Sequence, residues 1–419
     1  MSEFFPLVAN QLHAEAVPLK EIAARFGTPT YVYSKASLAT AYRRLDTAFA
    51  GHEHLICYAM KANSSLALLN LFARLGAGFD IVSGGELKRV IAAGGNPRKV
   101  VFSGVGKTEA EMRFALDAGV LCFNVESESE LKRLGNVATG MGKPAAVSFR
   151  VNPDVDPKTH PYISTGLKGS KFGVAFSEAL RLYEAADAMP NLQVTGIDGH
   201  IGSQITETAP LQEALEKMLS LVDRLASEGI AINHIDVGGG LGIAYRDEVP
   251  PAFEEYAQAL LGVLAGRKEK LILEPGRALV GNAGLLLTRV EYLKHGESRN
   301  FAIVDAAMND LMRPALYDAH HQIREVAAQD TQAQRYDVVG PICESADFLG
   351  LARDLAVSEG DLLAVMSAGA YSAAMSSNYN SRGRAAEVLV DGDEVHLIAE
   401  RESIEAVFAR ERIVDSLKL

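Results

Sequence analysis

One lysine stands at the end of an apolar segment, residues 54–63 (HLICYAMKAN). The segment is typical of a buried strand, so Lys61 would either reach back to water or lie in a pocket. In a pocket, desolvation of the ammonium would lower the pKa of the amine and make it a nucleophile. Such an amine forms Schiff bases with carbonyl compounds, and pyridoxal phosphate is the commonest resident aldehyde in enzymes. Taken alone, the segment favours the solvent-seeking lysine, and other parts of the chain must decide.

Two segments further along could bind a phosphate group. An apolar run at 232–237 leads into three glycines, 238–240, and a second run at 271–273 leads into Glu274, Pro275, Gly276 and Arg277. Successive glycines let backbone N–H groups converge on an anion, and Arg277 adds a positive charge. Glu274 could bind the pyridine nitrogen of a cofactor and keep it protonated, which makes the ring a stronger electron sink. A tight turn for the glycines and a salt bridge between Glu274 and Arg277 are the structural alternatives.

A third segment, residues 198–204 (DGHIGSQ), follows another apolar run. His200 could lie flat against a cofactor ring, and Ser203 could donate a hydrogen bond to its phosphate. A single strand-end histidine is more often a satisfied core residue. The pairs His52/His54 and His320/His321 lack cysteine or acidic partners at ligand spacing, so we interpret them as surface or loop histidines and predict no metal site.

The elements that would position these residues alternate regularly. Apolar runs separated by helix-like stretches indicate parallel βα units whose sheet is covered on both faces. Eight such units fit a (β/α)₈ barrel of the TIM type better than an open doubly wound sheet, and we assign the barrel to residues 36–278. In such barrels the active site lies at the carboxyl ends of the strands, and loops seven and eight often bind phosphate. The strands are expected near 54–60, 78–83, 99–104, 121–126, 145–151, 194–200, 232–238 and 271–275.

The pattern changes after about residue 280. Strand-like segments near 285–290, 301–304, 336–339 and 361–366 have no long helices between them, and 387–398 reads as a hairpin around an Asp-Gly turn. Residues 30–33 (TYVY) are also strand-like and precede the barrel. We therefore predict that residues 1–35 and 279–419 form an antiparallel β-sandwich or β-barrel domain.

Bulk composition excludes several classes of partner. The chain has 419 residues, a formal net charge of -12 and no basic block, which argues against nucleic acid and anionic membranes. No signal-peptide pattern opens the chain, and no apolar stretch approaches the length of a membrane span. The three cysteines are too few and too scattered for a disulfide framework or a zinc site. A reduced, cytoplasmic setting is the prediction.

Four motifs in this order, YAMKAN (58–63), HIGSQ (200–204), GGGLG (238–242) and EPGR (274–277), resemble the alanine-racemase-type barrel family of pyridoxal-phosphate-dependent decarboxylases. Within the family, the chain most resembles members that convert meso-2,6-diaminopimelate to L-lysine and CO₂, the last step of bacterial lysine biosynthesis. The resemblance implies that Lys61 is the Schiff-base lysine, that His200 stacks on the ring and that Glu274 binds the pyridine nitrogen. It further implies that the cofactor, pyridoxal 5'-phosphate, is bound by Lys61, His200, Ser203, Gly239, Gly240, Glu274, Gly276, Arg277 and Tyr371.

The resemblance extends into the C-terminal third. Residues 308–317 (MNDLMRPALY) are similar to the family's substrate segment, and Cys343-Glu344-Ser345 and Gly369-Ala370-Tyr371 match two further motifs. The implied catalytic residues are Lys61, His200 and Cys343, with Cys343 as the proton donor. The implied substrate-binding residues are Arg277, Arg313, Tyr317, Glu344 and Tyr371. In such enzymes Cys343 and Glu344 would enter the site from the other subunit of a homodimer.

Substrate choice depends mainly on Arg313. A guanidinium can hold the distal carboxylate of diaminopimelate in a bidentate fork, and Glu344 can accept its distal ammonium. A decarboxylase of ornithine, arginine or lysine would need acidic groups in place of the arginine, and it is the main alternative. An amino-acid racemase is a weaker alternative, because its second base is normally a tyrosine in a different motif. A non-catalytic pyridoxal-phosphate-binding protein is also weaker, because such proteins resemble the barrel alone.

Overall fold

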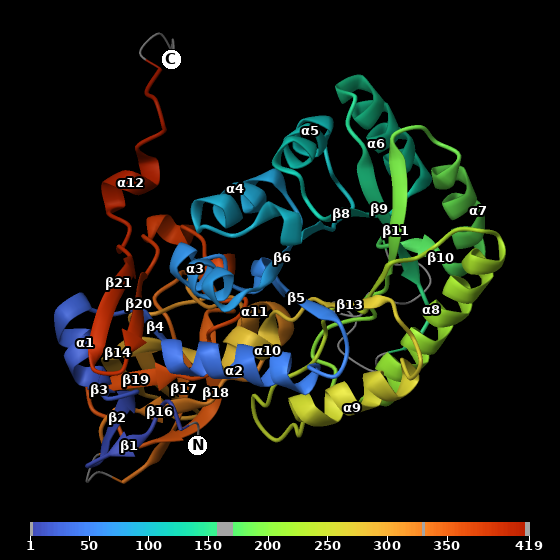
Figure 1. Cartoon of the computed structure of the whole chain (residues 1–419). Helices are drawn as coiled ribbons and strands as arrows, with labels where there is room; N and C mark the ends of the chain where they lie inside the picture. The colour runs from blue at the N-terminus through green and yellow to red at the C-terminus, as the bar shows by residue number, and fades with distance from the viewer. Residues whose placement is uncertain (1–2, 157–170, 329–331, 415–419) are drawn as a thin grey trace. The chain divides into compact units, whose positions relative to one another are not determined.

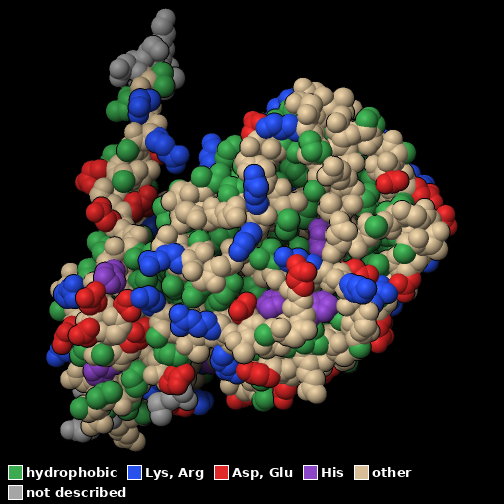
Figure 2. All heavy atoms as spheres, viewed as in Figure 1, with side chains coloured by type: hydrophobic (Ala, Val, Ile, Leu, Met, Phe, Trp, Pro, Cys, Tyr) green, Lys and Arg blue, Asp and Glu red, His purple; other side chains and the backbone are tan. Residues whose placement is uncertain are grey.

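The computed structural model describes residues 3–156, 171–328 and 332–414, and these form two compact units (Figure 1). One unit spans Ala39–Val280, and the other combines Met1–Leu38 with Gly281–Leu419. The sequence-based limits lie at residues 36 and 278. Among the described residues, no helix is both long enough and apolar enough to cross a membrane. On the face seen in Figure 2, acidic and basic side chains are interspersed.

The first unit is a closed barrel of eight parallel strands. The ring closes because β13 pairs with β5 and β8 pairs with β9, which excludes the open sheet. All eight strands coincide with predicted apolar runs, so the predicted (β/α)₈ barrel is confirmed. Around the ring the strands are β5 (His54–Ala59), β6 (Gly78–Ile81), β7 (Val100–Phe102), β8 (Cys122–Val125), β9 (Ala145–Asn152), β11 (Leu192–Asp198), β12 (His234–Asp236) and β13 (Lys270–Leu273).

Helices follow the strands and surround the ring (Figure 1). Side-chain caps fix where several begin: Ser83 caps α4, and Thr108 with Glu111 forms a capping box on α5. Each such cap satisfies backbone N–H groups that the helix itself leaves unpaired, and stabilises it by about 1 kcal/mol. The barrel helices are α3 (Leu66–Leu75), α4 (Gly84–Ala92), α5 (Glu109–Ala118), α6 (Glu128–Met141), α7 (Phe176–Asp187), α8 (Ala209–Ser227), α9 (Phe253–Val263) and α10 (Arg277–Val280).

The barrel interior is filled by side chains. Cys57, Val101, Cys122 and Ile272 form one buried cluster. His234 is buried as well and leaves room only for a glycine at position 196, where a Cβ atom would lie 2.0 Å from its Nε2. Because interiors packed in this way resist deformation, the carboxyl ends of the strands are held in fixed positions.

The second unit is β-rich. Its main sheet has the order β18-β17-β15-β14-β4-β20-β21, and β19 joins β14 to β16. The N-terminal strand β4 pairs with β14 and β20, so residues 30–33 are part of this sheet. The strands are β4 (Thr30–Ser34), β14 (Gly284–His295), β15 (Asn300–Val304), β16 (Ile323–Glu325), β17 (Gln334–Val339), β18 (Phe348–Leu355), β19 (Leu362–Val365), β20 (Ala386–Asp391) and β21 (Glu394–Ala399).

Two pairings in this sheet are parallel, β4 with β20 and β15 with β17, where the sequence suggested antiparallel strands. Both pairs are joined by long connections, and only long connections allow parallel neighbours. Strand content alone does not reveal this direction. The hairpin of β20 and β21 does turn at Gly392, with φ +63°, as the Asp-Gly signal predicted.

Smaller elements complete the β-rich unit. Those near the N-terminus pack on a core that includes Phe5, Leu12, Leu19, Leu285 and Val388. The elements are β1 (Leu7–Val8), β2 (Gln11–Ala14), β3 (Val17–Pro18), α1 (Leu19–Phe26), α11 (Arg313–Tyr317), α12 (Ile404–Phe408) and the 3₁₀ turn η6 (Tyr379–Ser381).

Candidate active site

Lys61 lies on the 3₁₀ turn η1 (Met60–Ala62), directly after β5 ends at Ala59. The predicted strand therefore ends two residues before the lysine. Its Nζ donates a hydrogen bond to Oδ2 of Asp80 at 2.7 Å, and Asp80 is buried on the neighbouring strand β6. The Lys61 side chain is 42% exposed, so the amine is tethered at the barrel rim and still reachable from outside this unit.

Three carboxylic acids meet at the ends of β11, β12 and β13. Asp198, Asp236 and Glu274 are buried, and their carboxylate oxygens lie within 4.8 Å of one another. Burial, and then the charges of Asp236, Asp80 and Asp198, raise the pKa of Glu274 well above its usual range. Burial raises the pKa of Asp236 to about 7 and that of Asp198 also rises. The cluster therefore holds protons near neutral pH, and a cation placed against it would relieve its repulsion.

Arg277 joins three loops of the barrel. Its Nη1 donates to the Tyr245 hydroxyl at 2.5 Å and its Nη2 donates to Ser203 Oγ at 3.2 Å. Ser203 follows β11, Tyr245 follows β12 and Arg277 follows β13. The salt-bridge alternative for Glu274 and Arg277 is not what the structure shows, because the guanidinium turns towards these two hydroxyl groups. Tyr245 was missed in the sequence, where only its position after the glycine-rich loop could have marked it.

The glycine triplet has a packing reason of its own. At Gly239 a Cβ atom would lie 2.1 Å from the carbonyl oxygen of Glu274. At Gly240, with φ +108°, it would lie 2.6 Å from the carbonyl oxygen of Gly202. Glycine is required here because three loops approach one another closely. The same absence of side chains leaves a cradle of bare backbone beside Ser203 and Arg277, the setting in which phosphate groups bind.

His200 is half-buried beside this cradle. The Gly239 N–H donates to His200 Nδ1 at 3.2 Å, so Nδ1 carries a lone pair and no proton. Burial, reinforced by the charges of Arg150 and Lys61, lowers the pKa of His200 well below its usual value. The imidazole is therefore neutral, which suits a ring that stacks on a cationic aromatic system.

The barrel residues fit pyridoxal phosphate by their chemistry. Lys61 supplies an amine for the aldehyde, and Glu274 supplies a carboxylate for the pyridine nitrogen. Arg277, Ser203 and the backbone of residues 238–240 supply a cation and donors for the phosphate. The barrel thus brings together on one rim the residues that the sequence predicted from four separate motifs, together with Gly276, which packs against Ala59 and Ala62.

In the β-rich unit, Arg313 is the first residue of α11 and is buried. Its Nη1 lies 2.8 Å from Nε2 of His321, which is fully buried. His321 lies in the loop before β16, as the surface-or-loop interpretation allowed, but it is buried and not at the surface. His320 instead contacts Arg353.

Cys343 and Glu344 are exposed in the loop between β17 and β18. The turn η6 holds both: the Cys343 N–H donates to Asn380 Oδ1 at 2.9 Å, and the Tyr379 hydroxyl donates to Glu344 Oε2 at 2.9 Å. The bond to Glu344 raises the pKa of Tyr379. Sequence motifs had not singled out Tyr379 or Asn380.

Two predicted tyrosines are half-buried in the same unit. Tyr317 ends α11, four residues after Arg313. Tyr371 follows β19 with φ +55°, a left-handed conformation that is uncommon for a residue with a side chain. Such strained positions cluster at functional sites, because surrounding structure must hold them in place.

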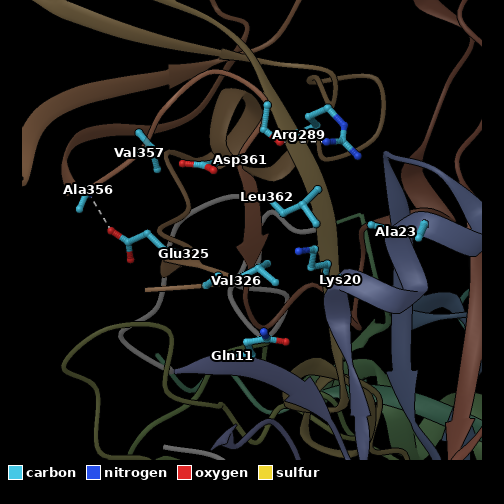
Figure 3. A pocket seen from close by; sticks show the side chains of 13 residues that line it. Gln11, Lys20, Ala23, Arg289, Glu325, Val326, Ala356, Val357, Asp361 and Leu362 are labelled. Carbon is cyan, nitrogen blue, oxygen red and sulfur yellow. Dashed lines mark hydrogen bonds between the residues drawn. The ribbon is translucent and has the colours of Figure 1, made fainter. Parts of the chain in front are cut away.

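A cavity of about 320 Å³ in the β-rich unit has none of the predicted residues in its lining (Figure 3). Lys20, Arg289, Glu325 and Asp361 line it. Arg289 Nη1 donates to the Gly360 carbonyl, and Glu325 Oε1 accepts from the Ala356 N–H. These bonds stabilise loops of the sheet, so we do not include the cavity in the candidate site.

Comparison with known proteins agrees with this geometry. Residues 35–281 match the family described as pyridoxal-dependent decarboxylase, pyridoxal binding domain. A diaminopimelate decarboxylase of Pseudomonas aeruginosa is 60% identical over 404 residues, which cover 96% of this chain and 97% of that protein. A crystal structure of diaminopimelate decarboxylase from M. jannaschii superposes with a TM-score of 0.95 at 38% identity, covering 99% of both chains. One from Helicobacter pylori, complexed with L-lysine, superposes with a TM-score of 0.91 at 41% identity, covering 94% of this chain and 98% of that one. The chain therefore belongs to the diaminopimelate decarboxylases, within the family of pyridoxal-dependent decarboxylases.

Proposed function

We propose that the protein decarboxylates meso-2,6-diaminopimelate to L-lysine and CO₂ with pyridoxal 5'-phosphate as cofactor, the last step of bacterial lysine biosynthesis. The observation that carries the proposal is the convergence of Lys61, Glu274 and the Ser203–Arg277 pair on one barrel rim. Diaminopimelate decarboxylases that match this chain over nearly their full length support the same reaction. The enzyme is then a carboxy-lyase.

The barrel would hold the cofactor. Arg277, Ser203, Gly239, Gly240 and Gly276 would surround its phosphate, with Tyr371 as a further contact from the β-rich unit. Neutral His200 would lie against the ring, and Glu274 would accept the N–H of the pyridine nitrogen. When bound, pyridoxal phosphate supplies an electron sink for the pair of electrons that the departing CO₂ leaves behind.

The buried carboxyl groups have a defined part in this arrangement. A cationic ring nitrogen beside Glu274 would let that side chain ionise in spite of its raised pKa, because the two charges compensate. Asp236 and Asp198 would surround this pair with further negative charge and favour the protonated ring nitrogen. Asp80 would hold Lys61 at the rim before and after the lysine engages the cofactor.

Cys343 would return a proton to Cα, at the position that the carboxylate has left. The thiol proton moves from Sγ to carbon and leaves a thiolate, which solvent then protonates again. Because Cys343 and Glu344 are exposed in their own unit, we propose that they complete the site of a second subunit in a homodimer. Tyr379 and Asn380 would hold these two residues in place.

Arg313 would select the substrate. Together with Arg277 it would bind the distal carboxylate, Glu344 would accept the distal ammonium, and Tyr317 and Tyr371 would line the substrate. A decarboxylase for ornithine, arginine or lysine would present no buried arginine to a substrate that ends in a cation, because like charges would face each other. The three free cysteines, two of them buried, fit a reducing cytoplasmic location, which we also propose.

The direct test is CO₂ release from meso-diaminopimelate, ornithine, lysine and arginine, each offered at the same concentration to the purified, cofactor-loaded enzyme. We expect release from diaminopimelate, with L-lysine as the product, and less than about 1% of that rate from the other three. Turnover of ornithine without turnover of diaminopimelate would contradict the proposal.

A further inference from the structure

Arg313 is held by an unusual partner for a buried cation. The guanidinium is 7% exposed, and its Nη1 lies 2.8 Å from Nε2 of His321, which is 0% exposed. The other ring nitrogen, Nδ1, lies 2.8 Å from the carbonyl oxygen of Met366. These three residues form a chain of two hydrogen bonds that ends on the backbone.

The partners decide where the proton of His321 lies. A carbonyl oxygen only accepts, so Nδ1 must donate to Met366. An arginine only donates, so Nε2 must accept from Arg313 and carries no proton. His321 is therefore the neutral imidazole with its hydrogen on Nδ1.

The anchor of this chain is rigid. His321 lies two residues before β16 and Met366 directly follows β19, and these strands pair antiparallel with Ile323 opposite Val365. The Met366 N–H also donates to the Gln322 carbonyl at 2.8 Å. The imidazole thus sits on a fixed two-stranded ladder and transmits that position to the guanidinium.

We propose that His321 is a positioning residue for substrate recognition: it orients Arg313 towards the distal carboxylate without cancelling the charge of the guanidinium. The inference rests on the proposed function, in which Arg313 binds that carboxylate. Because the guanidinium is a planar fork of five N–H donors, fixing Nη1 fixes the direction of the others. A neutral ring can do this, whereas an aspartate or glutamate would neutralise the arginine and compete with the substrate's own carboxylate.

Elsewhere in the chain, lysines are held by acids. Lys61 is bound by Asp80, and the buried Lys107 by Glu130 at 2.7 Å. A carboxylate partner suits a lysine that is held in place between reaction steps or that stabilises the fold. A cation that must bind an anionic group of the substrate requires a partner without charge, and this difference explains a histidine at position 321.

The inference makes a prediction that depends on substrate structure. Decarboxylation removes the carboxylate from the reacting carbon, so the product L-lysine keeps the distal carboxylate. By contrast, 1,5-diaminopentane has no carboxylate, and its binding should not depend on the orientation of Arg313. In the cofactor-loaded enzyme, His321→Met fills a similar volume but offers no acceptor to the guanidinium. We expect this variant to raise KM for meso-diaminopimelate and the inhibition constant of L-lysine about 10–100-fold, while the inhibition constant of 1,5-diaminopentane changes less than about twofold.

Two variants serve as controls. His321→Gln again offers an oxygen acceptor and an N–H donor, and we expect it to restore KM to within about threefold of the wild-type value. His320→Ala removes the adjacent histidine, which contacts Arg353 instead, and should leave KM unchanged. Cofactor absorbance and thermal unfolding of each variant report whether the fold is retained.

A double-variant cycle separates this inference from the proposed function. If Arg313→Ala raises KM and the further change His321→Met adds nothing to it, the two residues act as one unit, as proposed. If Arg313→Ala raises KM but His321→Met alone does not, or if His321→Met weakens 1,5-diaminopentane binding equally, the role of His321 is wrong and the proposed function stands. If Arg313→Ala leaves KM for diaminopimelate unchanged, the assignment of Arg313 itself fails.

Discussion

The two units of the chain hold their functional residues in opposite ways. In the barrel, Glu274, Asp236 and Arg277 are buried, and burial or neighbouring charge shifts the pKa of both carboxyl groups. In the β-rich unit, Cys343 and Glu344 are exposed on a loop that a short turn holds. The barrel residues are buried and electrostatically coupled to one another, whereas Cys343 and Glu344 are open to solvent.

This difference has a physical reason. A barrel rim can fix many groups at once, because eight strands end there on a packed interior. Such a site suits a cofactor that remains bound through every turnover. Residues that bind and release a substrate are often placed on loops, because loops are more mobile and more variable in sequence than the elements they connect. Arg313 is intermediate, since it is buried in the β-rich unit and we propose that it binds the substrate.

The largest effect that separates the units should come from Lys61→Ala. Removal of the amine that engages the cofactor is expected to lower kcat by at least about 10³-fold, since both attachment and positioning are lost. Borohydride treatment of the wild-type enzyme should attach the cofactor to Lys61, as peptide mapping would show. Label on another lysine, or a variant with near-normal activity, would remove the barrel from its proposed role.

A large effect in the other unit should come from Cys343→Ala. Loss of a proton donor is expected to lower kcat about 10²–10⁴-fold while cofactor absorbance stays unchanged. Cys122→Ala is the matched control, because burial raises the pKa of that thiol and keeps it inert. Rates measured under single-turnover conditions would show whether proton return has become the slow step. Equal rates for both variants would mean that Cys343 has no catalytic part.

The buried carboxyl cluster of the barrel predicts that the stability of the cofactor-free enzyme depends on pH. Since the folded pKa of Asp236 is raised to about 7, the native state holds a proton that the unfolded chain releases above about pH 4. Stability of the cofactor-free enzyme contributed by this group is therefore present at low pH and is lost as pH rises through about 7. Asp236→Asn should flatten this dependence by about 1–3 kcal/mol between pH 5 and 8.

Urea unfolding at several pH values measures this effect. Asp117→Asn, which changes an exposed carboxylate on α5, is the control and should leave the profile as it is in the wild type. A profile that Asp236→Asn does not change would show that the buried carboxyl groups do not share protons as described.

The smallest effect should come from Tyr379→Phe. It removes one exposed hydrogen bond to Glu344, and is expected to lower kcat/KM for diaminopimelate about 2–10-fold without any change in cofactor affinity. Tyr292→Phe, on an exposed part of β14, is the matched control. A loss of cofactor affinity in Tyr379→Phe would contradict the division of roles between the two units.

Much of the fold could be predicted from the sequence because barrel strands read as apolar runs with helical stretches between them. Residues Lys61, Glu274 and Arg277 were visible because each stands directly after such a run. The parallel pairing of β4 with β20 was not visible, since strand content does not encode the direction of a partner hundreds of residues away.

Residues that act through contacts between distant segments could not be found in this way. Tyr245 binds Arg277 across 32 positions, and Tyr379 binds Glu344 across 35. The burial of His321 could not be predicted, because it depends on β19, which follows it by more than 40 residues. Asp80 and Asp236 lay in predicted strands, but their neighbours could not be identified before the closed barrel placed the ends of these strands side by side.

The most direct test of the division between the units uses Arg313→Ala. Cofactor affinity, followed by absorbance titration, should stay within about twofold of the wild-type value, because the barrel holds the cofactor. In the same preparation kcat/KM for meso-diaminopimelate should fall about 30–1,000-fold, since a buried charged contact to the distal carboxylate is lost. A parallel loss of cofactor affinity, or an unchanged kcat/KM, would contradict the account.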